Sequence, residues 1–132
     1  MPLDIELGEA TPTAALALRQ CQPLPGGQQF GAMLVIRSGG FAAALPFFVE
    51  RAALGAWCTG IAALERGTAE EQTLTERDGQ SFIAIAREHA AGVTIRGELH
   101  DMEERQRMSF RFTIGSRALA QLRRGLEDAL HE

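Results

Sequence analysis

Histidines and cysteines are the side chains most typical of structural zinc sites, and their spacing in this chain matches no known metal motif. His89, His100 and His131 form no HxxxH or HxH pair. Cys21 and Cys58 lie far apart, without a CxxC pair or a histidine at metal-ligand spacing. The sequence therefore predicts no metal site and two reduced, buried thiols rather than a disulfide.

The sequence also lacks the known motifs of catalytic and phosphate-binding sites. No serine lies in a GxSxG turn, and neither Gly26-Gly27 nor Gly39-Gly40 is followed by the GK[ST] of a phosphate loop. Carboxylates of the segment 101–104 could form an acid–base pair, but on a solvated hairpin tip their pKa values would stay ordinary. We therefore expect no catalytic residue, no cofactor and no enzymatic activity.

A hairpin positions many of the polar residues. Residues 93–99 and 108–114 alternate between apolar and polar types, which is typical of half-buried strands. With Asp101–Glu104 as a four-residue loop, His100 would oppose Arg105 and Glu98 would oppose Arg107. In this register every apolar residue meets an apolar one on the same face.

Further strands are predicted by the same reasoning. Ser81–Arg87 leads into this hairpin, Gly31–Arg37 has an apolar centre, and Phe41–Phe48 follows a bend. Pro46 removes a ladder donor and favours an edge or a bulge. The stretch Thr68–Asp78 is predicted to be an exposed acidic connection, with room for one short strand around Leu74.

Two helices are predicted by leucine-rich stripes. Residues 49–66 carry Leu54, Trp57, Ile61 and Leu64 at spacings of three and four, and Gly67 is a natural C-terminal stop. Residues 116–131 carry a second stripe, with Ser116 as the N-cap.

The first part of the chain is less decided. Asp4–Leu7 is predicted as a short strand. Residues 11–22 fit either a helix beginning at Thr11-Pro12 or a strand, of which we favour the strand. No internal repeat is apparent.

Composition and charge limit the number of domains and the classes of partner that we expect. The 132 residues, 45% hydrophobic and 23% charged, suit a single domain spanning 1–132. A net charge of −4 and a pI near 5.4 argue against a nucleic-acid partner. No apolar run approaches the roughly 18 residues of a membrane helix, and no signal peptide is apparent, so we expect a cytoplasmic protein without a membrane partner. All thirteen basic residues are arginine, which indicates a GC-rich bacterial genome.

These elements predict an α+β fold: a twisted antiparallel sheet of about five to seven strands packed on two helices. The predicted core contains large side chains from the hairpin and both helices, namely Trp57, Ile61, Ile95, Phe110, Phe112, Leu119 and Leu122.

The order of features resembles a known family. The features that carry the resemblance are the Ser38-Gly39-Gly40-Phe41 stretch, the amphipathic helix after it, the Ile95-Arg96-Gly97-Glu98-Leu99 strand and the leucine-striped C-terminal helix. The resemblance covers Phe30 to Leu130, and it is to the WapI-family immunity proteins and related small bacterial families. The resemblance implies a non-catalytic protein that binds and occludes a cognate toxin domain. It carries over no site residues.

Acidic side chains are the candidate contact surface for such a partner, because a negative surface would attract a basic toxin. They lie in the acidic connection and in the hairpin, as Glu70, Glu71, Glu76, Asp78, Glu98, Asp101, Glu103 and Glu104. Two alternatives remain open. One is a structural module, with a homodimer possible through a sheet edge. The other is a small-ligand binder with a pocket lined by Trp57, Phe48 and Phe110.

Overall fold

The computed structural model describes residues 2–8, 14–88, 92–101, 103 and 105–131. Four strands and a helix are followed by four more strands and a second helix. The elements in chain order are β1 (Leu3–Gly8), β2 (Ala14–Pro23), β3 (Gln29–Ser38), β4 (Phe41–Glu50), α1 (Arg51–Arg66), β5 (Glu71–Thr75), β6 (Phe82–Arg87), β7 (Gly92–Asp101), β8 (Gln106–Gly115) and α2 (Ala118–Leu130).

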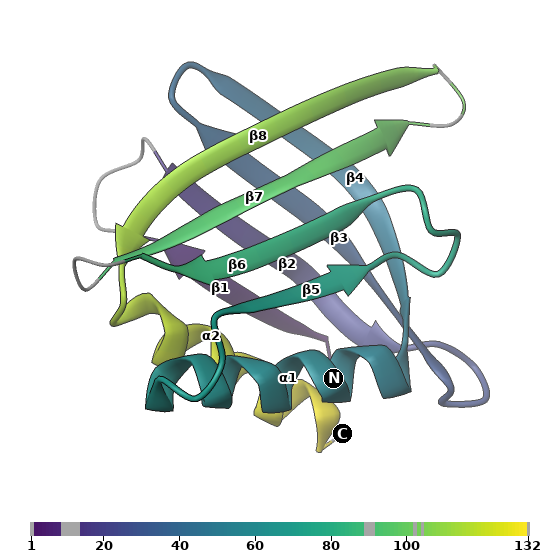
Figure 1. The fold of residues 1–132 in the computed structure, drawn as a ribbon. Coiled ribbons are helices and arrows are strands. Elements are labelled where there is room, and N and C mark those ends of the chain that lie inside the picture. Colours follow the sequence, from purple (N-terminus) through teal and green to yellow (C-terminus); the bar gives the residue numbers. More distant parts are fainter. Residues whose placement is uncertain (1, 9–13, 89–91, 102, 104, 132) are drawn as a thin grey trace.

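The strands form two antiparallel sheets of four, each in sequential order. Strands β1–β4 make the first sheet and β5–β8 the second. The sheets cross, both helices lie at one end of the molecule, and β8 and the β3–β4 turn lie at the other end (Figure 1). The predicted α+β class is confirmed. The eight strands are divided between two sheets, whereas one sheet was expected.

The core fills the space between the inner faces of the sheets and the two helices. All seven predicted core residues are buried, and they belong to one cluster with Leu16, Phe30, Leu34 and Ile85. Each helix reaches across to the other half of the chain, since α1 packs against β5 and α2 against β1. Between the helices, Arg123 forms an ion pair with Glu65.

Local signals explain where α1 begins and ends. Val49 pairs with Phe30 in the β3–β4 ladder, so the helix starts at Arg51 rather than at residue 49. Gly67 ends it in the left-handed conformation, at φ 76°, as predicted. Helix α2 begins at Ala118. Ser116 is not its N-cap, because Arg117 occupies that position and the Ser116 carbonyl accepts a turn hydrogen bond from the Leu119 N–H.

The β7–β8 hairpin forms, but its predicted register is wrong by two residues. Asp101 pairs with Gln106 and His100 with Arg107, so Glu98 opposes Ser109. Arg105 takes the left-handed conformation, at φ 55°, and belongs to the turn. Pairing therefore starts at Asp101 and Gln106 rather than at His100 and Arg105. An even shift leaves every side chain on its predicted face, which is why the apolar pattern was compatible with both registers.

Other strand predictions are confirmed. Strands β1, β3, β4 and β6 lie where they were expected, and β5 is the short strand around Leu74. The part of residues 11–22 that the structure describes is strand β2, while Thr11 and Pro12 lie outside the described residues. Pro46 lies on the edge strand β4. Both cysteines are buried and free. No described helix has the length and apolar character needed to cross a membrane.

Candidate functional site

A groove runs between the edge strands β4 and β8, at the end of the molecule away from the helices. We call it the inter-sheet groove. It consists of two adjoining hollows of about 320 and 540 Å³. Its lining comes from the turn and edge of the first sheet and from the last two strands of the second: Ser38, Phe41, Ala42, Ala43, Ala44, Leu45, Leu99, Asp101, Gln106, Arg107, Met108, Ser109, Phe110 and Arg111.

The groove has an apolar floor and a polar rim. Ala43, Leu45 and Met108 are partly buried and pack against the core, which makes the floor. Along β8 the intervening side chains, Arg107, Ser109 and Arg111, point to the other face and are exposed. The alternation of strand β8 therefore places cations and a hydroxyl beside an apolar trough.

Phe41 stands out at one end of this groove. Its side chain is 74% exposed, the largest exposure of any large hydrophobic residue described. It begins β4, directly after the Ser38–Phe41 turn, and it lines the same hollow as Arg107 and Arg111. The Ser38 hydroxyl donates a hydrogen bond of 3.2 Å to the Arg111 carbonyl, which ties this turn to β8. An exposed aromatic ring on a fixed turn can stack on a flat ligand.

The charge of the molecule is distributed unevenly along the chain. Residues 105–126 contain six arginines and no carboxylate, although the whole chain carries −4. Strand β8 lies wholly within this basic segment, whereas the last turn of α2 lies beyond it and carries Glu127 and Asp128. Arg107 lines both hollows of the inter-sheet groove and also a further one at the end of the β7–β8 hairpin. On its β8 side the groove is bordered by Arg107 and Arg111, of which Arg111 also lies 3.8 Å from Glu88, and it is lined by Asp101 as well.

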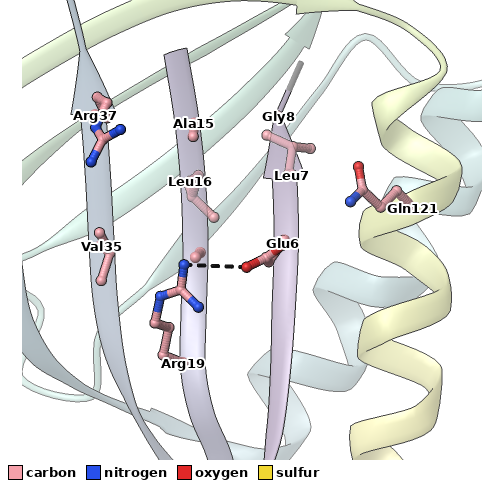
Figure 2. A pocket seen from close by; sticks show the side chains of 10 residues that line it. Glu6, Leu7, Gly8, Ala15, Leu16, Arg19, Val35, Arg37 and Gln121 are labelled. Carbon is pink, nitrogen blue, oxygen red and sulfur yellow. Dashed lines mark ion pairs between the residues drawn. The ribbon is translucent and has the colours of Figure 1, made fainter. Parts of the chain in front are cut away.

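A separate hollow of about 260 Å³ lies on the outer face of the first sheet, beside α2 (Figure 2). We call it the α2 hollow. Arg37 and Arg19 on neighbouring strands, Glu6 on β1 and Gln121 on α2 surround small residues of β1 and β2. Arg19 forms ion pairs with Glu6 at 3.2 Å and with Asp4 at 3.6 Å.

The acidic residues predicted as a partner surface are divided between the two ends of the second sheet. Glu71 pairs with Arg96 at 3.3 Å and Glu98 with His100 at 3.3 Å. Asp78 lies 3.9 Å from Arg77. The remaining members are Glu70 and Glu103, which are exposed, Asp101, which lines the groove, and Glu104, which lies outside the described residues.

Glu76 is the member of this set with a structural role. Its carboxylate accepts a hydrogen bond of 3.4 Å from the Phe48 N–H and so connects the β5–β6 turn to β4. Burial raises the pKa of Glu76 above its ordinary value, and the hydrogen bond from Phe48 opposes that shift.

The predicted small-ligand pocket is absent from the described structure. Trp57 is 2% exposed and packs inside the core, and the Phe48 ring is covered by the Arg77 guanidinium at 4.7 Å. Phe110 lines the inter-sheet groove but is itself 6% exposed. The core fills the space that such a pocket would need. The described residues also contain no cluster of three or more potential metal ligands.

Sequence reasoning missed the groove because its two walls are distant in the chain. Phe41 was interpreted as part of an apolar strand, since nothing local shows which end of a strand projects into solvent. The arginine-rich segment was the available signal. The positive charge of this segment does not show in the net charge, because the rest of the chain is acidic.

Comparisons with known proteins identify the fold but no family. No family model and no curated protein matches the chain. A crystal structure of MRP1/MRP2 from trypanosoma bruciei is similar with a TM-score of 0.57 and 14% identity, over 99% of this chain and 85% of that one. A guideRNA-binding protein complex bound to a gRNA is similar with a TM-score of 0.56 and 12% identity, over 99% and 91%.

These likenesses contradict the functional prediction made from the sequence. An immunity protein with a toxin domain as partner, and with no nucleic-acid partner, was expected, whereas one of the structures sharing the fold is a guideRNA-binding complex and neither is described as an immunity protein. The argument by which nucleic acid was excluded, from the net charge of the whole chain, was also physically insufficient. Phosphate contacts depend on the local arrangement of arginines, and the net charge does not report it.

Proposed function

We propose that this protein binds single-stranded nucleic acid, RNA in the first place, in the inter-sheet groove. The observation that carries the proposal is Phe41, 74% exposed beside Arg107 and Arg111 in one hollow. An aromatic platform next to basic side chains is the combination that binds single strands without sequence preference. The fold shared with a guideRNA-binding complex supports the same partner class.

The geometry favours a single strand over a duplex. The faces of paired bases are covered by their neighbours, so a protruding ring such as Phe41 can stack only on an unpaired base. The apolar floor of Ala43, Leu45 and Met108 suits further unstacked bases. Arg107 and Arg111 on the rim would hold the phosphates, and Ser109 would offer a hydroxyl to the ribose 2′-OH or to a phosphate. The mechanism is binding alone and needs no catalytic group. Two free thiols are in keeping with the cytoplasm as the proposed compartment.

A labelled oligouridine of about twelve nucleotides, within the site sizes usual for such domains, tests the proposal by fluorescence anisotropy. Phe41→Ala should weaken binding by about 5- to 150-fold, because stacking contributes about 1–3 kcal/mol per base. Met33→Ala is the matched control: Met33 is 41% exposed and lies outside the groove. Both side chains are solvent-facing, so both variants should remain folded.

The arginines have their own measurable signature. Arg107→Gln should flatten the dependence of log K on log salt by about 0.7 for one lost phosphate contact. Arg66→Gln, in the last turn of α1, should leave the slope unchanged. The proposal fails if neither single-stranded RNA nor DNA binds the wild-type protein at low salt, or if Phe41→Ala binds as tightly as Met33→Ala.

A further inference from the structure

A hollow of about 720 Å³ adjoins the inter-sheet groove at the end of the β7–β8 hairpin. We call it the hairpin hollow. It is lined by the end of β7, the turn and the start of β8, namely His100, Asp101, Arg105, Gln106 and Arg107. Asp101, Gln106 and Arg107 also line the groove, so the two spaces are continuous. Since β7 ends and β8 begins at the periphery of the molecule (Figure 1), the groove has Phe41 at one end and the hairpin hollow at the other.

Two arginines without a salt bridge line this hollow. In the part of the chain that the structure describes, Arg105 and Arg107 form no ion pair and no side-chain hydrogen bond, whereas Arg96 in the same sheet pairs with Glu71. Both side chains are exposed. Arg105 also takes the left-handed conformation, at φ 55°, which favours glycine, and residues held in such strained conformations gather at functional sites. The hollow therefore presents two guanidiniums whose N–H donors are available to a ligand.

The other charged groups described around the hollow are already engaged. The His100 imidazole pairs with the Glu98 carboxylate at 3.3 Å. The Asp101 carboxylate accepts a hydrogen bond of 3.2 Å from the Glu103 N–H, which holds it within the turn. The Glu103 side chain is exposed on that turn and does not line the hollow. A strand that continued past the two arginines would meet these carboxylates, whereas a strand that ends in the hollow would not.

We propose that the hairpin hollow binds the terminal phosphate of the nucleic-acid strand that occupies the inter-sheet groove. This inference rests on the proposed function and specifies its partner as a strand with a phosphorylated end. A terminal phosphomonoester carries a charge of about −1.5 to −2 at pH 7, whereas an internal phosphodiester carries roughly −1. Two guanidiniums match the more highly charged group, because each presents paired N–H donors to phosphate oxygens.

The two arginines have different parts in this arrangement. Arg107 lines the groove as well as the hairpin hollow, so it contacts the strand whether or not its end is phosphorylated. Arg105 lines the hairpin hollow and neither hollow of the groove, so its contact is specific to the strand end. Arg105 is therefore the residue whose replacement separates recognition of the end from binding of the strand.

Three unlabelled oligouridines of about twelve nucleotides test the site, by competition with the labelled strand described above. One has a 5′-phosphate, one a 3′-phosphate and one a hydroxyl at both ends. Wild-type protein should bind at least one of the phosphorylated strands about tenfold more tightly than the hydroxyl-ended strand, which corresponds to one hydrogen bond between charged groups. The end that is preferred gives the direction in which the strand lies in the groove.

Arg105→Gln should abolish this preference, so that all three strands bind with one affinity. Arg124→Gln removes an exposed arginine from α2, at the other end of the molecule, and as the matched control it should keep the tenfold ratio. A general loss of positive charge cancels, because each variant is judged by the ratio of two affinities. Arg105→Gly is a second variant that should also lose the preference, since glycine adopts a positive φ without strain. Circular dichroism establishes that each variant is folded.

The outcomes separate this inference from the proposed function. If the wild type binds all three strands equally, the inference is overturned and the proposed function stands, because the hydroxyl-ended strand still binds. The inference is also overturned if Arg105→Gln and Arg105→Gly keep the preference as Arg124→Gln does, since the terminal phosphate then lies elsewhere. If no strand of any kind binds at low salt, the proposed function fails and the inference fails with it.

Discussion

Gly97 on β7 should tolerate a side chain poorly, because the space beside its Cα is filled. A Cβ atom there would lie 2.2 Å from the Phe82 carbonyl oxygen and 2.9 Å from a ring carbon of Phe110, whereas ordinary contacts begin near 3.4 Å. Strands β6 and β7 would have to separate by about 1 Å in the middle of their ladder. Overpacking costs about 1–3 kcal/mol and occasionally more. Because backbone is displaced, we expect Gly97→Ala to lose about 3 kcal/mol or more.

Gly55 on α1 provides the opposite case with the same substitution. Nothing lies within 4 Å of a Cβ atom built at Gly55, and its conformation is helical. Gly55→Ala should therefore stabilise the protein by about 0.5–1 kcal/mol, since alanine loses less backbone entropy in a helix. The two variants should differ by about 4 kcal/mol in free energy of unfolding.

Urea unfolding followed by the fluorescence of Trp57, the one tryptophan, measures both changes. The m-value should stay constant, because the surface exposed on unfolding is the same. A loss below about 1 kcal/mol for Gly97→Ala would show that β6 and β7 yield easily, against the packing argument. A destabilised Gly55→Ala would show that the open face of α1 is covered.

Three further outcomes follow from buried groups. Phe110→Ala should cost about 3–5 kcal/mol in the same urea titration, and a loss near 1 kcal/mol would place its ring outside the core. Burial raises the pKa of Cys21 to about 11 and raises that of Cys58 as well, so neither thiol should react with a disulfide reagent at pH 8 until the protein unfolds, when both should titrate. The raised pKa of Glu76 means that ionisation of this carboxyl opposes folding: stability is full below the unfolded value of 4.5 and declines as the pH rises through the folded pKa. Glu76→Gln should therefore raise the unfolding midpoint at pH 7 and have no such benefit at pH 4, and an equal change at both pH values would contradict that linkage.

Sequence patterns predicted those elements whose cause is local. The alternation of β7 and β8 follows from one buried face, and Gly67 provides the left-handed residue that ends α1. Pro46 favours an edge or a bulge, and β4 is an edge strand. The division into two sheets has no such local signal, because it depends on β4 and β5 not pairing. The groove has none either: Phe41 and Arg107 meet only once both sheets are in place. The predicted register of the β7–β8 hairpin was wrong for a related reason: a shift of two residues leaves every side chain on the same face of the sheet, so the apolar pattern does not distinguish the two registers.

The crossed placement of the helices also has a topological consequence. Helix α1 follows the first sheet yet covers β5, and α2 follows the second sheet yet covers β1, so each half completes the other. The succession of element types is four strands, a helix, four strands and a helix, and it reads the same when counted from β5 as when counted from β1. Because α2 packs against β1, the last of the ten elements lies beside the first, and the order of elements can be written as a closed cycle. The chain's order of elements is therefore equivalent to its own half-turn circular permutation, a two-fold symmetry of connectivity that is not apparent in the amino-acid sequence.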